Sequence, residues 1–104
     1  MNLPKTLTDL VAAQNNFDSK AYANCFSETA IVHDEGKTHK GKVAIEKWIS
    51  VANEKFKTVM NPIKYSEKEN ILEAEISGTF PGSPLVLNYQ FEFSGGKIQS
   101  LQIV

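Results

Sequence analysis

The sequence predicts a single α+β domain in which three helices close a curved antiparallel sheet around an apolar pocket. An apolar stripe with helical spacing follows Gly41, and apolar and polar residues alternate through most of the second half of the chain. The helical patterns come mostly before the strands, an order typical of α+β domains. A chain of 104 residues has room for one core, so we expect one domain, residues 1–104, and one site.

Three segments have helical patterns. Leu3 to Gln14 carries apolar residues at three- and four-residue spacing. Asp18 is a good N-cap for a short second helix, which runs to Phe26 and places Tyr22 on its apolar face. The third helix follows Gly41, and its apolar stripe consists of Ala44, Ile45, Trp48, Ile49, Ala52 and Phe56.

The other periodic segments are predicted strands, covering residues 29–34, 38–40, 58–66, 72–80, 85–93 and 97–104. The first two form a short hairpin, because Glu35-Gly36-Lys37 supplies a turn whose glycine can take a positive φ. Pro62 and Gly78 lie inside two of the later strands and are typical of places where a sheet bends. A bent sheet has a concave face, and helices that cover this face incompletely leave a pocket.

The composition excludes several classes of protein. Eleven basic and twelve acidic residues give a net charge of -1, so a polyanion gains little from counterion release and we expect no nucleic-acid partner. No apolar run approaches the roughly 20 residues needed to span a bilayer, and the N-terminus lacks the apolar region of a signal peptide. We therefore expect no membrane partner and a cytoplasmic location. The single cysteine, Cys25, fits a reducing compartment.

Residues 10–18, 21–26, 30–34 and 41–48 have the sequences LVAAQNNFD, AYANCF, AIVHD and GKVAIEKW. These segments resemble the nuclear transport factor 2-like superfamily, particularly its SnoaL-like and steroid delta-isomerase-like members. The resemblance implies a cone-shaped domain, with three N-terminal helices on the concave face of a curved, mostly antiparallel mixed sheet, and a homodimer. Members of the superfamily include isomerases, cyclases, dehydratases, transport adaptors and proteins with no known activity, so the fold alone does not settle the function.

Asp34 ends the first predicted strand, in a position similar to that of the general base of the family's isomerases. A carboxylate in a partly apolar pocket has a raised pKa and takes a proton from carbon more readily than it does in water. The alternative is an exposed aspartate at the start of a turn, where such residues are common. The position favours a base only if a pocket opens beside Asp34.

An isomerase also needs hydrogen-bond donors aimed at the developing oxyanion. The resemblance implies a tyrosine on the first helix and a protonated acid on a late strand, but Leu10 takes the first position and the late strands contain no aspartate. Tyr89 or Tyr22 is a candidate substitute, although a tyrosine on an apolar face is more often part of the core. Authentic steroid isomerisation is therefore not expected.

His33 and His39 flank the hairpin turn, and either is a candidate acid–base partner for Asp34. Neighbouring strand residues point to opposite faces, so without a bulge either His33 or Asp34 lies outside the pocket. These residues match no established metal-ligand spacing, and we predict neither a metal nor a cofactor.

Two functions are consistent with these patterns. The first is a cofactor-independent isomerase, cyclase or lyase with Asp34 as the base and Tyr89, Tyr22 or His39 as the donor. The second is a non-catalytic module that binds a small apolar molecule or pairs with a second copy through the outer face of the sheet. Trp48 either stacks on a flat ligand or packs in the core. The expected pocket-lining residues are Leu10, Tyr22, Phe26, Trp48, Phe80 and Phe91.

Overall fold

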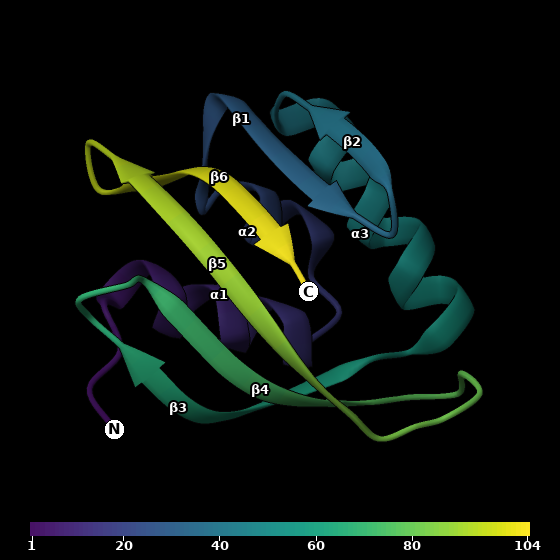
Figure 1. The fold of residues 1–104 in the computed structure, drawn as a ribbon. Coiled ribbons are helices and arrows are strands. Elements are labelled where there is room, and N and C mark those ends of the chain that lie inside the picture. The colour runs from purple at the N-terminus through teal and green to yellow at the C-terminus, as the bar shows by residue number, and fades with distance from the viewer.

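The computed structural model describes residues 1–104 and contains three helices and one six-stranded sheet (Figure 1). The helices are α1 (Lys5–Asn15), α2 (Ser19–Ala23) and α3 (Lys42–Phe56). The strands are β1 (Phe26–Asp34), β2 (Lys37–Lys40), β3 (Val59–Ser66), β4 (Ile71–Ser77), β5 (Leu85–Ser94) and β6 (Lys97–Ile103). All three helices lie behind the sheet in the view of Figure 1. None of them is long and apolar enough to cross a membrane.

The strand order across the sheet is β2-β1-β6-β5-β4-β3. Strands β3 to β6 form an antiparallel meander, in which each strand pairs with the next along the chain. The β1–β2 hairpin joins this meander through β6, and β1 and β6 run parallel. The sheet is therefore mixed and mostly antiparallel, as predicted, and it does not close into a barrel.

The second predicted helix is too long. It ends at Ala23, the Cys25 N–H donates to the Tyr22 carbonyl, and Phe26 begins β1, where it pairs with Ile98 of β6. Phe26 is therefore a strand residue. Helical spacing alone did not reveal this, because Phe26 is buried in either secondary structure.

The predicted strand over residues 72–80 is also too long, since β4 ends at Ser77. The Thr79 N–H donates to the carbonyl oxygen of Phe56 at the end of α3, with an N–O distance of 2.8 Å. A β-carbon on Gly78 would lie 2.5 Å from that same oxygen. Only glycine therefore lets the β4–β5 connection approach the end of α3 so closely. Pro62 lies where it was predicted, in the edge strand β3 beside a shift in register.

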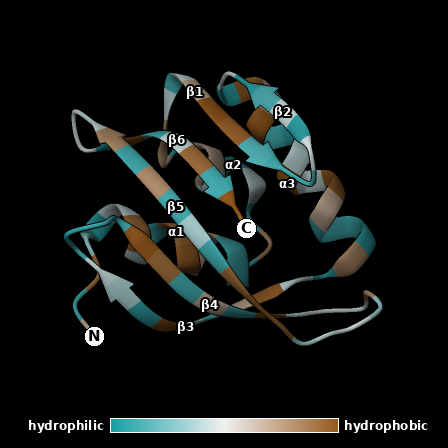
Figure 2. Cartoon of the chain, viewed as in Figure 1, coloured by the Kyte–Doolittle hydropathy of each residue, from teal (hydrophilic) through white to brown (hydrophobic).

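One apolar core lies between the helices and the sheet. Helix residues and strand residues contribute to it alike, and the fully buried members include Leu7, Leu10, Tyr22, Phe26, Val32, Ile45, Leu72, Ile98 and Leu101. Hydrophobic and hydrophilic segments alternate along β4 and β5 in Figure 2, as expected for strands with one buried face. The inner face of the sheet therefore faces the helices, and the polar face lies outside.

A buried amide cluster, which no sequence pattern indicated, joins α1 to α3 and to the start of β3. The Gln14 Nε2 donates to the Asn53 Oδ1 at 2.9 Å and to the Thr58 carbonyl oxygen at 2.8 Å. The next residue, Asn15, exchanges two hydrogen bonds with the backbone of Met60. These bonds satisfy buried polar groups where the helix layer meets the edge of the sheet.

Candidate functional site

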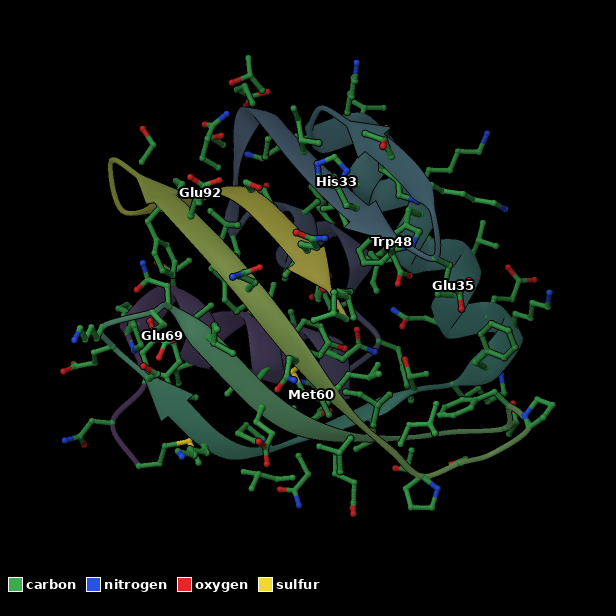
Figure 3. All side chains as sticks on the ribbon, viewed as in Figure 1. His33, Glu35, Trp48, Met60, Glu69 and Glu92 are labelled. Atoms are coloured by element: carbon green, nitrogen blue, oxygen red, sulfur yellow. The ribbon has the colours of Figure 1, made fainter.

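Asp34 is the last residue of β1, and its side chain lies on the inner face of the sheet. Val32, two residues earlier, is fully buried, and Asp34 is half-buried. His33 is exposed on the other face, with its Nδ1 3.2 Å from the hydroxyl of Thr38 (Figure 3). The strand alternation therefore resolves the two predicted alternatives, with Asp34 inside and His33 outside.

A two-residue turn holds the end of β1. Asp34 pairs with Lys37 across the hairpin, and Glu35 and Gly36 between them have φ angles of 51° and 75°. Two consecutive positive φ angles are typical of a type I′ turn, whose twist suits the flanking strands. Glycine takes this conformation at no cost, whereas a glutamate in it is strained. The chain therefore accepts local strain directly beside Asp34.

Tyr89 approaches the same space from two strands away. Val32 pairs with Leu101 and His33 with Gln102, so continuing the register places Asp34 level with Ile103. Ile103 in turn pairs with Tyr89 of β5. Neighbouring strands lie about 4.8 Å apart, so the backbones of Asp34 and Tyr89 are separated by about 10 Å. The Asp34 charge is close enough to raise the pKa of Tyr89. Tyr89 is only 6% exposed.

Three further side chains gather beside Asp34 and Tyr89. The ring of Tyr22, on α2, lies 6.2 Å from the ring of Trp48, on α3. The ring of His39, on β2, lies 5.4 Å from the ring of Trp48. His39 pairs with Val32 and therefore shares the inner face with Asp34. We call Asp34, His39, Tyr22, Trp48 and Tyr89 the Asp34 cluster, in which each residue comes from a different helix or strand.

The surroundings of Asp34 make it a stronger base. Burial raises the pKa of its carboxyl above the ordinary value of 3.8, and the negative charge of Glu35 raises it further. His39, the Trp48 side chain and the Glu35 backbone N–H favour the carboxylate and oppose part of this rise. Burial also raises the pKa of both Tyr22 and Tyr89, with an added contribution from the Asp34 charge. The two phenols therefore stay protonated and able to donate at neutral pH.

The other predicted lining residues lie in the core or at its edge. Leu10 and Phe26 are fully buried and Phe91 is 2% exposed, so these side chains belong to the core. Phe80 lies in the β4–β5 connection, where its ring packs edge-on against Phe56 with centroids 6.1 Å apart. Trp48 is half-buried and adjoins both Tyr22 and His39, a position at the edge of the apolar stripe of α3.

Three hollows lie elsewhere on the molecule. One of about 430 Å³ is bordered mainly by α1 and α2, and two of about 320 Å³ lie near the β3–β4 turn and on the outer face of the sheet. None of these is bordered by Asp34 or Tyr89, so a pocket beside the Asp34 cluster stays a prediction. No group of three or more histidine, cysteine, aspartate or glutamate side chains is arranged to hold a metal ion.

Comparison with known proteins identifies the family. No protein-family model matches the sequence, and no curated protein matches it. Among solved structures, a candidate polyketide cyclase from Sinorhizobium meliloti is 34% identical with a TM-score of 0.91, and the match covers 98% of this chain and 95% of that one. An NTF2-like protein of unknown function from Cytophaga hutchinsonii is 14% identical with a TM-score of 0.77, over 100% of this chain and 90% of that one.

The chain belongs to the nuclear transport factor 2-like superfamily. A third similar structure is a protein of ketosteroid isomerase-like fold from Catenulispora acidiphila, solved in complex with trimethylamine. It is 20% identical to this chain with a TM-score of 0.86, and the match covers 99% of this chain and 86% of that one. At 14% and 20% identity, the Cytophaga and Catenulispora proteins support the nuclear transport factor 2-like fold alone.

We expect Asp34→Asn to raise the melting temperature by a few degrees at neutral pH. The folded protein holds the Asp34 proton more tightly than the unfolded chain, so the wild type loses stability as the pH rises from 3.8 through the raised pKa. Asparagine does not ionise, so the variant does not lose stability in this way as the pH rises. Thermal unfolding of both proteins between about pH 3 and about pH 8 measures the difference, which should vanish at the acid end.

The exposed carboxylate of Asp9, substituted as Asp9→Asn, is the matched control and should show no such gain. If the difference in melting temperature between the wild type and Asp34→Asn does not grow with pH, the pKa of Asp34 is not raised.

Proposed function

We propose that this protein is a cofactor-independent enzyme that removes a proton from a carbon next to a carbonyl, with Asp34 as the general base. The observation that carries the proposal is the half-buried position of Asp34 on the inner face, among Tyr22, Trp48 and Tyr89. A base with a raised pKa is better matched to a weakly acidic carbon. Isomerases, cyclases and lyases can all begin with this step, and the Sinorhizobium relative is described as a candidate polyketide cyclase.

The proposed step conserves charge and protons. The Asp34 carboxylate takes the proton, and the electron pair of the carbon–hydrogen bond moves toward the carbonyl oxygen, which becomes an enolate oxygen. The Tyr89 hydroxyl donates a hydrogen bond to that oxygen as its charge develops. The protonated Asp34 then returns the proton to another carbon. Alternatively, the enolate carbon attacks a second carbonyl of the same substrate and closes a ring, and Asp34 gives its proton to the alkoxide oxygen that this attack forms.

His39 has a different part in this proposal. It lies on the strand next to Asp34, and its charge favours the Asp34 carboxylate. Its ring also packs against Trp48, whose side chain favours the carboxylate as well. We therefore assign His39 to holding Asp34 ionised, and Tyr89 to donating toward the substrate.

We expect Asp34→Asn to slow proton removal by at least about 100-fold, the usual contribution of a general base. Proton removal is measured by NMR as exchange of carbon-bound hydrogen for deuterium in a panel of enolisable ketones and diketones. In the wild type the rate should fall as the pH decreases through the raised pKa of Asp34, because only the carboxylate accepts a proton.

His33→Asn is the matched control, since His33 lies on the same strand with its side chain on the outer face. The His33→Asn variant should catalyse deuterium exchange in the ketones and diketones at the wild-type rate. Equal rates in the wild type and Asp34→Asn would remove Asp34 from the mechanism.

A second candidate function is binding of a small organic cation without catalysis. The Asp34 cluster combines one carboxylate with the aromatic rings of Tyr22, Trp48 and Tyr89, and aromatic faces attract ammonium groups. The Catenulispora protein, of the same fold, was solved with trimethylamine. This candidate needs no proton transfer.

Trp48 is the single tryptophan, so its fluorescence reports directly on the cluster. If the protein binds a cation, trimethylammonium should change this fluorescence saturably, and Asp34→Asn should abolish the change. Neutral tert-butyl alcohol, similar in shape, is the matched control ligand and should have no saturable effect. An equal response to both ligands would contradict cation binding.

We also propose that a second copy of the chain covers the outer face of the sheet. Polar residues dominate that face, but Val86 is 57% exposed there, and a hollow of about 320 Å³ is lined by residues of β3, β4 and β5. A mixed surface of this kind suits a wet interface between subunits.

Light scattering should therefore give a mass twice that of one chain, and Val86→Lys should reduce it to that of the monomer. Val43→Lys is the control, because Val43 is 85% exposed on α3, on the helix side of the sheet. A wild-type mass equal to one chain would reject the dimer.

A further inference from the structure

A hollow of about 320 Å³ lies at one end of the domain, where the start of α1 meets two turns of the sheet. The β3–β4 turn contributes Glu67 and Asn70 to its lining, and the β5–β6 turn contributes Gly96. The Thr6 hydroxyl donates to the Gly96 carbonyl oxygen at 2.6 Å, so α1 is attached to the second turn beside the hollow. All three segments lie on the left side of the molecule in Figure 1. The volume is within the usual range for pockets that hold a small molecule.

This hollow is separate from the Asp34 cluster. Gly96 directly precedes β6, whereas Asp34 lies level with Ile103 at the other end of that strand. Seven residues of extended chain span about 23 Å, so the two places lie roughly 20 Å apart. None of the residues that line the hollow belongs to the Asp34 cluster.

Two aromatic side chains line the hollow. Tyr65, on β3, and Phe93, on β5, are both half-buried there. The Phe93 ring stacks on Phe91 with centroids 5.9 Å apart, which leaves its second face free of that contact. The Tyr65 hydroxyl lies 3.2 Å from the Asn70 Oδ1, a hydrogen bond that holds the ring in place. The hollow therefore offers two aromatic rings in fixed orientations.

A carboxylate without a partner lies beside these rings. Glu67 lines the hollow and belongs to neither of the two ion pairs of the chain. Burial raises the pKa of Tyr65, and the negative charge of Glu67 raises it further, so the two groups are close. No lysine lines the hollow. Its charge is therefore negative.

We propose that this hollow binds a small organic ammonium ion against the rings of Tyr65 and Phe93, with Glu67 as its counter-ion. The face of an aromatic ring carries negative charge and attracts ammonium groups, quaternary ones included. A neutral ligand would gain nothing from the charge of Glu67, and an anion would be repelled by it. This binding is independent of the proposed function of Asp34.

The ion enters as a free molecule and not as part of a membrane. Both rings are recessed, and no large exposed apolar side chain lines the hollow. A protein that docks on a lipid surface inserts such side chains beside the headgroup. The occupant is therefore a soluble ammonium compound.

Tetramethylammonium chloride is the probe, and NMR follows its binding through the backbone N–H signals of Asn70 and Gly96. Both signals should shift saturably, after correction with sodium chloride at the same ionic strength. The neutral molecule tert-butyl alcohol has a similar shape and should give no saturable shift. The N–H signal of Asp34 reports separately on the Asp34 cluster.

Glu67→Gln should weaken binding of the probe about threefold or more, as expected for one partly exposed electrostatic contact. Glu69→Gln is the matched control, because it removes a carboxylate from the same turn that does not line the hollow. Tyr65→Leu should weaken binding by a similar factor, whereas Tyr65→Phe keeps the ring and should bind as the wild type does. Glu67 is exposed, so Glu67→Gln should melt at the wild-type temperature and its weaker binding would not reflect unfolding.

Equal binding by Glu67→Gln and Glu69→Gln would overturn the proposal. Equal shifts with tert-butyl alcohol would also overturn it, because the hollow would then be merely apolar. The same holds if Asn70 and Gly96 show no saturable shift, or if only Asp34 responds to the probe. Co-sedimentation of the protein with phosphatidylcholine vesicles would reject a free ion in favour of a lipid headgroup. None of these results bears on the proposed function, which fails on the deuterium exchange of Asp34→Asn.

Discussion

The parallel pairing of β1 with β6 is the contact on which the site depends. Asp34 and Tyr89 are far apart in sequence, and the register of Val32 with Leu101 brings them to the same face with only Ile103 between them. A parallel pair requires a long crossover connection. Here α3 and the meander provide it, and α3 carries Trp48 back across the hairpin. The same connection therefore completes the sheet and assembles the Asp34 cluster.

The cluster carries features that lower the stability of the fold. A carboxylate with a raised pKa, two buried hydroxyls without protein partners and a glutamate at positive φ all lie within one small region. The buried Gln14 amide, by contrast, is hydrogen-bonded to both Asn53 and Thr58. This contrast is typical of functional sites, where local stability is lost in exchange for reactive groups.

Much of this arrangement could be predicted from local patterns, and the rest depends on distant contacts. Alternation along the first strand predicts that Asp34 and His33 face opposite sides, and the turn residues predict the hairpin between them. The end of β4 at Ser77 was missed because it depends on the Phe56 carbonyl, which lies beside Gly78 only in the folded chain. Tyr22 and Trp48 were expected to line one pocket, but the direct packing of their rings could not be predicted, since helical spacing shows which face is apolar and not what it contacts. The pocket, the dimer and the chemistry remain proposals.

We conclude that the fold holds the Asp34 carboxyl in a half-buried site beside Tyr22 and Tyr89. The most direct measurement is an NMR titration that follows the Asp34 carboxyl carbon and the ring signals of both tyrosines in the wild-type protein. We expect a carboxyl midpoint above 3.8, with both tyrosine rings shifting at that same midpoint. A midpoint at or below 3.8, with tyrosine signals that do not follow it, would mean that Asp34 is solvated and not beside the two tyrosines.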